Sequence, residues 1–83
     1  MTVYPNPNQG NFTVEISSAV SMHNADLYLT DLTGKIITSR TLNIEAGTTQ
    51  IFLGYLDLQM GTYLVQLREN DNQLKPVKVV VSR

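Results

Sequence analysis

The sequence predicts a small all-β domain, an antiparallel, immunoglobulin-like β-sandwich of about seven short strands. Apolar and polar residues alternate with a period of two in several segments. Turn-forming residues separate these segments at a spacing of roughly ten residues. No stretch carries a convincing helical periodicity. With 83 residues the chain is long enough for one small domain and not two, so we expect a single domain over residues 1–83.

The chain starts with a proline-containing segment, Tyr4-Pro5-Asn6-Pro7-Asn8-Gln9-Gly10. Each proline fixes its own φ and favours extended geometry in the residue before it. We therefore expect residues 1–10 to form a stiff, extended lead-in, and residues 11–83 to form the sandwich. Gly10 then lets the chain turn into the first strand.

Regular alternation predicts the first two strands, over residues 12–17 and 25–30, with a loose connection over residues 18–24. The residues that we expect to face the core are Phe12, Val14 and Ile16 in the first strand and Ala25, Leu27 and Leu29 in the second.

The middle of the chain begins with Asp31-Leu32-Thr33-Gly34, which has the Asp-first, Gly-fourth signature of a type I turn. A third strand follows over residues 35–42, where the adjacent Ile36 and Ile37 leave the facing open and favour a bulge or twist. After a turn over residues 45–48, a strand over residues 49–53 should place Ile51 and Leu53 inward.

Residues 54–60 are too short and too glycine-bounded for a helix, so we expect a loop or one 3₁₀ turn. Gly61-Thr62-Tyr63-Leu64-Val65, at the start of a strand reaching Arg68, has the layout of a tyrosine corner. In such a corner the Tyr63 hydroxyl would bond to the backbone upstream, and Val65 would take an inward position. The alternative is that Tyr63 is simply one core aromatic.

The last strand follows a polar turn over residues 69–73 and runs from about Leu74 to Ser82. Because proline lacks an amide donor, Pro76 makes Val77–Val81 either an edge strand or a strand that begins after the proline. A valine-rich terminal strand of this kind favours weak dimerisation by strand exchange.

Composition excludes several classes of function. Six basic and seven acidic residues give a net charge of −1 without a basic stripe, so we expect no nucleic-acid partner. The apolar runs are far shorter than a membrane span, so we expect no membrane insertion. Without cysteine there is no disulfide and no thiolate metal site. No signal peptide precedes the proline segment, so we interpret the chain as excised from a longer protein, with a small cytosolic protein as the alternative.

No constellation of residues points to catalysis, so we expect no enzymatic activity, no catalytic residue, no metal and no cofactor. His23 is the only histidine, and the carboxylates are scattered singly over strands and turns. A calcium loop using Asp26, Asp31 or Asp71 is an alternative, but no EF-hand spacing exists and turn formation explains these residues better. A sugar platform would need exposed aromatics; we expect Phe12, Phe52 and Tyr63 in the core, which leaves Tyr4, Tyr28 and Tyr55.

Four blocks of sequence, in this order, resemble the type A C-terminal sorting domain of the type IX secretion system of Bacteroidota. The likeness covers nearly the whole chain, and its order and spacing are more specific than any single block. The residues that carry it, and that we take as candidate recognition residues, are Tyr4, Pro5, Asn6, Pro7, Gly10 and Phe12; Asp31, Gly34 and Lys35; Gly61 and Tyr63; and Lys78, Val79, Val80, Val81 and Arg83. Leu58 also belongs to the third block of the resemblance.

The resemblance implies a C-terminal address that exports an attached cargo protein. The precursor would cross the inner membrane by its own signal, and the domain would fold in the periplasm and be recognised by the secretion machinery. A cell-surface sortase would then cleave ahead of the domain, leaving the cargo at the cell surface or outside the cell. We expect Lys35, Lys75, Lys78 and Arg83 to contribute to docking. The alternative is an adhesive or carbohydrate-binding immunoglobulin-like module retained on a secreted protein.

Overall fold

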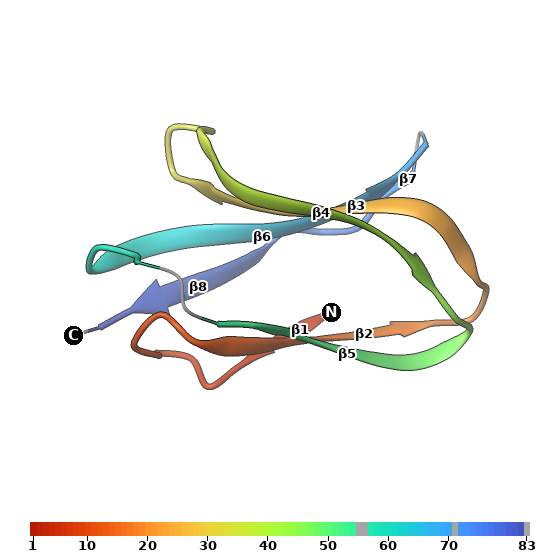
Figure 1. The fold of residues 1–83 in the computed structure, drawn as a ribbon, viewed down its shortest axis with the longest axis horizontal. Helices are drawn as coiled ribbons and strands as arrows, with labels where there is room; N and C mark the ends of the chain where they lie inside the picture. Colours follow the sequence, from red (N-terminus) through yellow and green to blue (C-terminus); the bar gives the residue numbers. More distant parts are fainter. Residues whose placement is uncertain (55–56, 71, 83) are drawn as a thin grey trace.

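The computed structural model describes residues 1–54, 57–70 and 72–82, and these residues form eight strands in two antiparallel sheets (Figure 1). The described residues contain no helix, and hence none long and apolar enough to cross a membrane. The strands are β1 (Thr2–Tyr4), β2 (Phe12–Ser18), β3 (Met22–Asp31), β4 (Ile36–Ile44), β5 (Gly47–Leu53), β6 (Gly61–Glu69), β7 (Asn72–Gln73) and β8 (Val77–Val81).

The connectivity is that of an immunoglobulin-like sandwich. One sheet has the order β1-β2-β5, and the other has the order β4-β3-β6, with β7 and β8 both pairing with β6. The chain passes from one sheet to the other after β2, after β4 and after β5 (Figure 1). These crossings join antiparallel strands in the Greek-key manner typical of such sandwiches. The predicted fold class is therefore confirmed.

The core lies between the two sheets and is built by the alternation that the sequence predicts. All six inward residues expected in the first two strands are buried. In the facing positions of the first sheet, Phe12 pairs with Leu53 and Val14 pairs with Ile51, so apolar side chains meet on the same inner face. The buried apolar residues are Val3, Phe12, Val14, Ile16, Ala25, Leu27, Leu29, Ile44, Leu53, Leu58, Tyr63, Val65, Leu67, Val79 and Val81.

A bulge in the β3–β4 pair explains the ambiguity of the two isoleucines. Thr30 pairs with Ile36, whereas the preceding Leu29 pairs with Thr38, so Ile37 is the extra residue. Ile36 and Ile37 are both exposed. The bulge expected from the sequence is thus present, and β4 continues beyond the predicted end to the buried Ile44.

Two expectations about the first sheet need correction. Phe52 is 56% exposed on the outer face, because Ile51 and Leu53 take the inner face and adjacent side chains in a strand point to opposite sides. The lead-in also does not stand apart from the sandwich, because Thr2–Tyr4 pairs with Thr13–Glu15 as β1 and Val3 is buried. Cis peptide bonds precede both Pro5 and Pro7.

The end of the chain agrees with the constraint set by Pro76. The last strand begins at Val77, after the proline, and pairs along its length with Gly61–Val65 of β6. Part of the predicted polar turn forms the two-residue strand β7 instead, and Asn70 in that turn has φ of 52°.

The tyrosine corner is present at the start of β6. The buried Tyr63 donates a hydrogen bond from its hydroxyl to the backbone carbonyl of Gln59, at 2.7 Å. Val65, two residues later, is fully buried as the motif requires. The corner therefore fixes how the segment before Gly61 enters the sheet.

Tyr63→Phe should lower the free energy of unfolding by about 1 kcal/mol, because the ring stays in place while the bond to the Gln59 carbonyl is lost. For a domain of this size that loss corresponds to a melting temperature lower by about 4–8 °C. Thermal unfolding followed by circular dichroism measures the effect. An unchanged melting temperature would show that the hydroxyl bond adds no stability.

Candidate functional site

The four blocks of candidate recognition residues, as far as the structure describes them, lie toward one end of the sandwich, which we call the signature end (Figure 1). The loop before Phe12, the turn after Asp31 and the segment before Gly61 all reach this end, and β8 finishes there. Antiparallel strands that alternate in direction bring such loops together although they are far apart in the sequence. The fold thus brings segments that lie far apart in the sequence to the same end of the sandwich.

The proline segment and the closing strand are joined directly. The Asn6 side chain donates to the Lys78 carbonyl at 2.9 Å and accepts from the Val80 amide at 2.9 Å. The Asn8 backbone donates to the Val80 carbonyl at 2.9 Å and accepts from the Ser82 amide at 2.7 Å. The first and last blocks of the resemblance therefore form one structural unit.

This unit also bears on the expected strand exchange. An unpaired edge of β8, on the side away from β6, could pair with a strand of another chain. In this structure the edge is not unpaired, because the backbone groups of Lys78, Val80 and Ser82 are hydrogen-bonded to Asn6 and Asn8. Dimerisation through that edge would require those bonds to be broken first, which argues against the expected exchange.

Asn8 is a site residue that the sequence reasoning missed. It is only 5% exposed, and its side chain donates to the Pro5 carbonyl at 3.1 Å and accepts from the Gly10 amide at 2.8 Å. The second bond spans two residues, as in the turns that asparagine commonly forms with its own backbone. Gly10 follows with φ of 105°, a conformation that favours glycine. The sequence Asn-Gln-Gly was the available signal for this turn.

The second block forms a tight turn around Asp31. One carboxylate oxygen accepts from the Thr33 hydroxyl at 2.6 Å, the Thr33 amide at 2.9 Å and the Lys35 amide at 3.0 Å. The turn closes with a bond from the Gly34 amide to the Asp31 carbonyl, and Gly34 has φ of 94°. The bond from the Thr33 hydroxyl is the main reason that the pKa of Asp31 lies below its usual value.

Because its folded-state pKa is lowered, Asp31 should stabilise the fold above its unfolded-state pKa near 3.8 and lose that contribution as the pH falls through the folded-state value. Asp31→Asn should therefore flatten the fall in melting temperature between about pH 5 and pH 2. Thermal unfolding of both proteins across this range makes the comparison. Parallel curves for the two proteins would contradict the role of the carboxylate.

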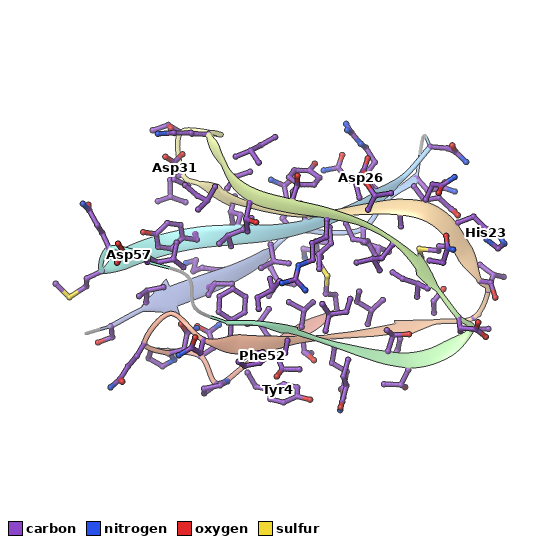
Figure 2. The ribbon with its side chains drawn as sticks, viewed as in Figure 1. Tyr4, His23, Asp26, Asp31, Phe52 and Asp57 are labelled. Atoms are coloured by element: carbon purple, nitrogen blue, oxygen red, sulfur yellow. The ribbon has the colours of Figure 1, made fainter. Side chains whose placement is uncertain are left out.

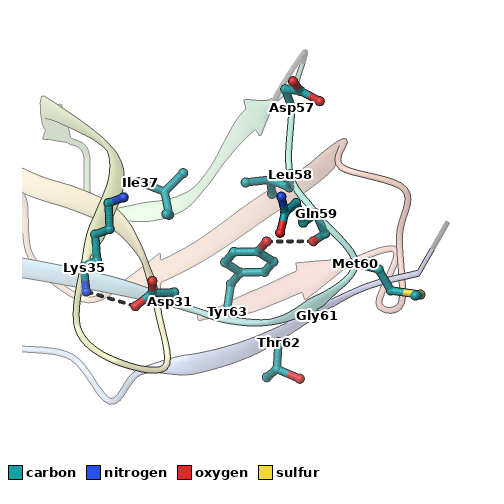
Figure 3. Close-up of a pocket in the computed structure, with 10 residues that line it drawn as sticks. All are labelled: Asp31, Lys35, Ile37, Asp57, Leu58, Gln59, Met60, Gly61, Thr62 and Tyr63. Atoms are coloured by element: carbon teal, nitrogen blue, oxygen red, sulfur yellow. Dashed lines mark hydrogen bonds between the residues drawn. The ribbon is translucent and has the colours of Figure 1, made fainter.

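A groove of about 510 Å³ separates this turn from the third block (Figure 3). Its walls carry Asp31 and Lys35 on one side and Leu58, Gln59 and Tyr63 on the other. Leu58 is buried, whereas Met60 projects outward and is largely exposed. The lining of the groove mixes both signs of charge with apolar side chains.

The family model described as the secretion system C-terminal sorting domain matches residues 2–82 of the chain. The chain belongs to this family. Members serve the type IX secretion system, so the sorting domain interacts with that machinery, is attached to a cargo protein and directs export to the cell surface or the extracellular space. Domains of this family are typically not enzymes. Neither the curated proteins nor the solved structures gave a match.

In this sorting domain the candidate recognition residues divide into surface and core. Four of them are buried in the hydrophobic core: Phe12, Tyr63, Val79 and Val81. Gly10 is buried in the loop that precedes β2. Arg83 lies outside the described residues. Those exposed are Tyr4, Pro5, Asn6, Pro7, Gly34, Lys35 and Lys78; Asp31, Gly61 and Val80 are half-buried.

The residues considered for other chemistry do not gather. His23 lies exposed at the end of the sandwich opposite to Asp31 and Asp57, and Asp26 lies on the outer face of the second sheet (Figure 2). Asp26 accepts a hydrogen bond from the Thr41 hydroxyl at 2.8 Å. Among the described residues no group of three or more histidines or acids could hold a metal ion; Asp71 is not among them.

Proposed function

We propose that this sorting domain is a folded, non-catalytic address that is recognised at its signature end and then removed. The match over residues 2–82 carries the proposal. The domain folds in the periplasm, the secretion machinery binds it there, and a surface sortase cleaves ahead of it to free the cargo from its tag. The sortase supplies the catalysis, and the domain supplies a shape and an accessible junction.

The fold supports recognition of an assembled surface. The four blocks are distant in sequence but share one end, and residues 6 and 8 meet residues 78–82 through four hydrogen bonds. β1 runs toward this end, so a chain that precedes it approaches from the opposite direction (Figure 1). A preceding cargo would therefore join the domain at Thr2, beside Glu15 near the middle of β2, and not at the signature end itself.

The test fuses a reporter protein ahead of the domain and expresses it in a bacterium with an intact type IX system and in one that lacks it. We expect export only in the strain with an intact system, and the exported reporter should be smaller than the fusion protein by the mass of the domain. Export in both strains would overturn the sorting role, and an exported reporter that keeps the domain would overturn removal by the sortase.

Within this function, Lys35 and Lys78 are proposed docking residues because both are exposed and belong to signature blocks. The double change Lys35→Gln with Lys78→Gln should reduce reporter export without lowering the melting temperature. Arg40→Gln, on β4, removes a similar charge away from the signature end and serves as the control. Equal export by the parent domain, the double variant and the Arg40→Gln control would contradict the docking role.

One observation favours the adhesive alternative. Tyr4 is 42% exposed and Phe52 is 56% exposed. The two residues flank Thr13 of β2, since Tyr4 pairs with it from β1 and Phe52 pairs with it from β5. Beside them Gln50 donates to the Tyr4 hydroxyl and to Glu15, both at 3.0 Å. Figure 2 shows the two aromatic residues on the outer side of this sheet. A retained module would stay on the exported protein and bind glycans there, whereas a sorting tag is removed.

A further inference from the structure

The outer edge of β8 carries backbone groups that alternate regularly in direction. The backbone groups of Lys78, Val80 and Ser82 point away from β6 and, within the described part of the chain, form four hydrogen bonds with Asn6 and Asn8. An asparagine side chain has a donor and an acceptor side by side. The Asn6 amide therefore takes the place that one residue of a neighbouring strand would fill, and the Asn8 backbone fills the next place.

The loop that supplies these groups is braced internally. The Asn8 side chain links the Pro5 carbonyl to the Gly10 amide, and it is almost fully buried. Because the same residue holds the loop together and pairs with Val80 and Ser82, the loop and the edge of β8 should open as one unit.

β1 is short and lies at the edge of its sheet. It contains three residues, its one strand partner among the described residues is β2, and it leads directly into the loop at Tyr4-Pro5. It also lies against β8, and the Tyr4 hydroxyl accepts from Gln50. Val3 is its one buried side chain. A strand this short is marginal without the elements around it. Its order therefore depends on whether the following loop stays attached.

We propose that residues 5–10 form a latch through which the outer edge of β8 controls order in the N-terminal segment of the domain. When the latch is closed, β1 is held against β2. When an extended polypeptide strand pairs with the outer edge of β8, it must displace Asn6 and Asn8, and the segment that joins the domain to its cargo is released.

Hydrogen exchange measured by NMR on the whole 83-residue chain tests the coupling. Asn6→Ala removes two bonds at the edge, so the Val80 amide must exchange faster. The latch further predicts that the Asn8, Gly10 and Ser82 amides and the protected amides of β1 accelerate by about tenfold, while those of β3 and β6 keep their rates. Acceleration confined to Val80 would overturn the proposal.

Gln9→Ala is the matched control, because Gln9 lies in the same loop with an exposed side chain and should leave all rates unchanged. A chain shortened to end at Val81 tests the coupling from the other side and decides the matter if Asn6→Ala fails to fold. It loses the bond from the Ser82 amide to Asn8 but keeps Asn6 intact. Faster exchange at Gly10 and in β1 would support the latch, and unchanged rates there would overturn it. These rates are independent of export, so either result leaves the sorting role as a separate question.

Discussion

Removal of residues 79–83 should unfold the domain, and export of an attached cargo should be lost with the fold. Val79 and Val81 are both fully buried, and β8 pairs with β6 through this stretch. Burying one valine contributes about 1.5–3 kcal/mol, so the two account for about 3–6 kcal/mol. A domain of this size has roughly 4–12 kcal/mol of total stability. The closing strand is thus a large part of what holds the fold together.

Circular dichroism and thermal unfolding of the shortened domain, together with export of a fused reporter, measure both effects. Lys78→Gln is the control for the melting temperature only, because it keeps the two buried valines while changing a proposed docking residue in the same strand. A shortened domain that melts normally but no longer directs export would contradict the structural role and assign the strand to docking alone.

Phe12→Ala should lower the free energy of unfolding by about 3–5 kcal/mol, as expected for a large cavity in a well-packed core. Phe12 is 1% exposed and faces Leu53 across the first sheet. Phe52→Ala is the matched control, because the same side chain is lost from an exposed position of the adjacent strand. It should cost less than about 1 kcal/mol.

Urea-induced unfolding of the two variants beside the parent domain gives both free energies. Equal losses, or a larger loss for Phe52, would contradict the assignment of the inner and outer faces. The comparison also shows that Phe12, although part of the family signature, acts through the core rather than through the surface.

Alternation alone was enough to predict most of the inner face. It placed Phe12, Val14 and Ile16 correctly because each apolar residue is followed by a polar one. Alternation also placed Ile51 and Leu53 inward, and the structure confirms this. The expectation of a buried Phe52 rested on the preference of aromatic rings for burial, and it is wrong because neighbouring side chains in a strand point to opposite faces.

The meeting of Asn6 and Asn8 with β8 could not be predicted. It joins residues more than 70 positions apart, and it depends on which edge of β8 is left free once β6 has paired with the other. A local sequence pattern predicts which residues of a strand face the core, but it does not predict which strand edge or loop will pair with that strand. The prolines were interpreted as a spacer ahead of the sandwich, although they belong to the loop that covers its last strand.

The inclusion of β1 in the first sheet decides what kind of remnant each cut would leave after secretion. A cut before Thr2 would leave the sheet complete and the remnant compact. A cut between Pro5 and Asn11 would detach the outermost strand and bare the backbone of β2 at Thr13–Glu15, where a second remnant could add to it. If the tag is removed as proposed, the position of the cut would therefore decide whether this edge of β2 stays covered.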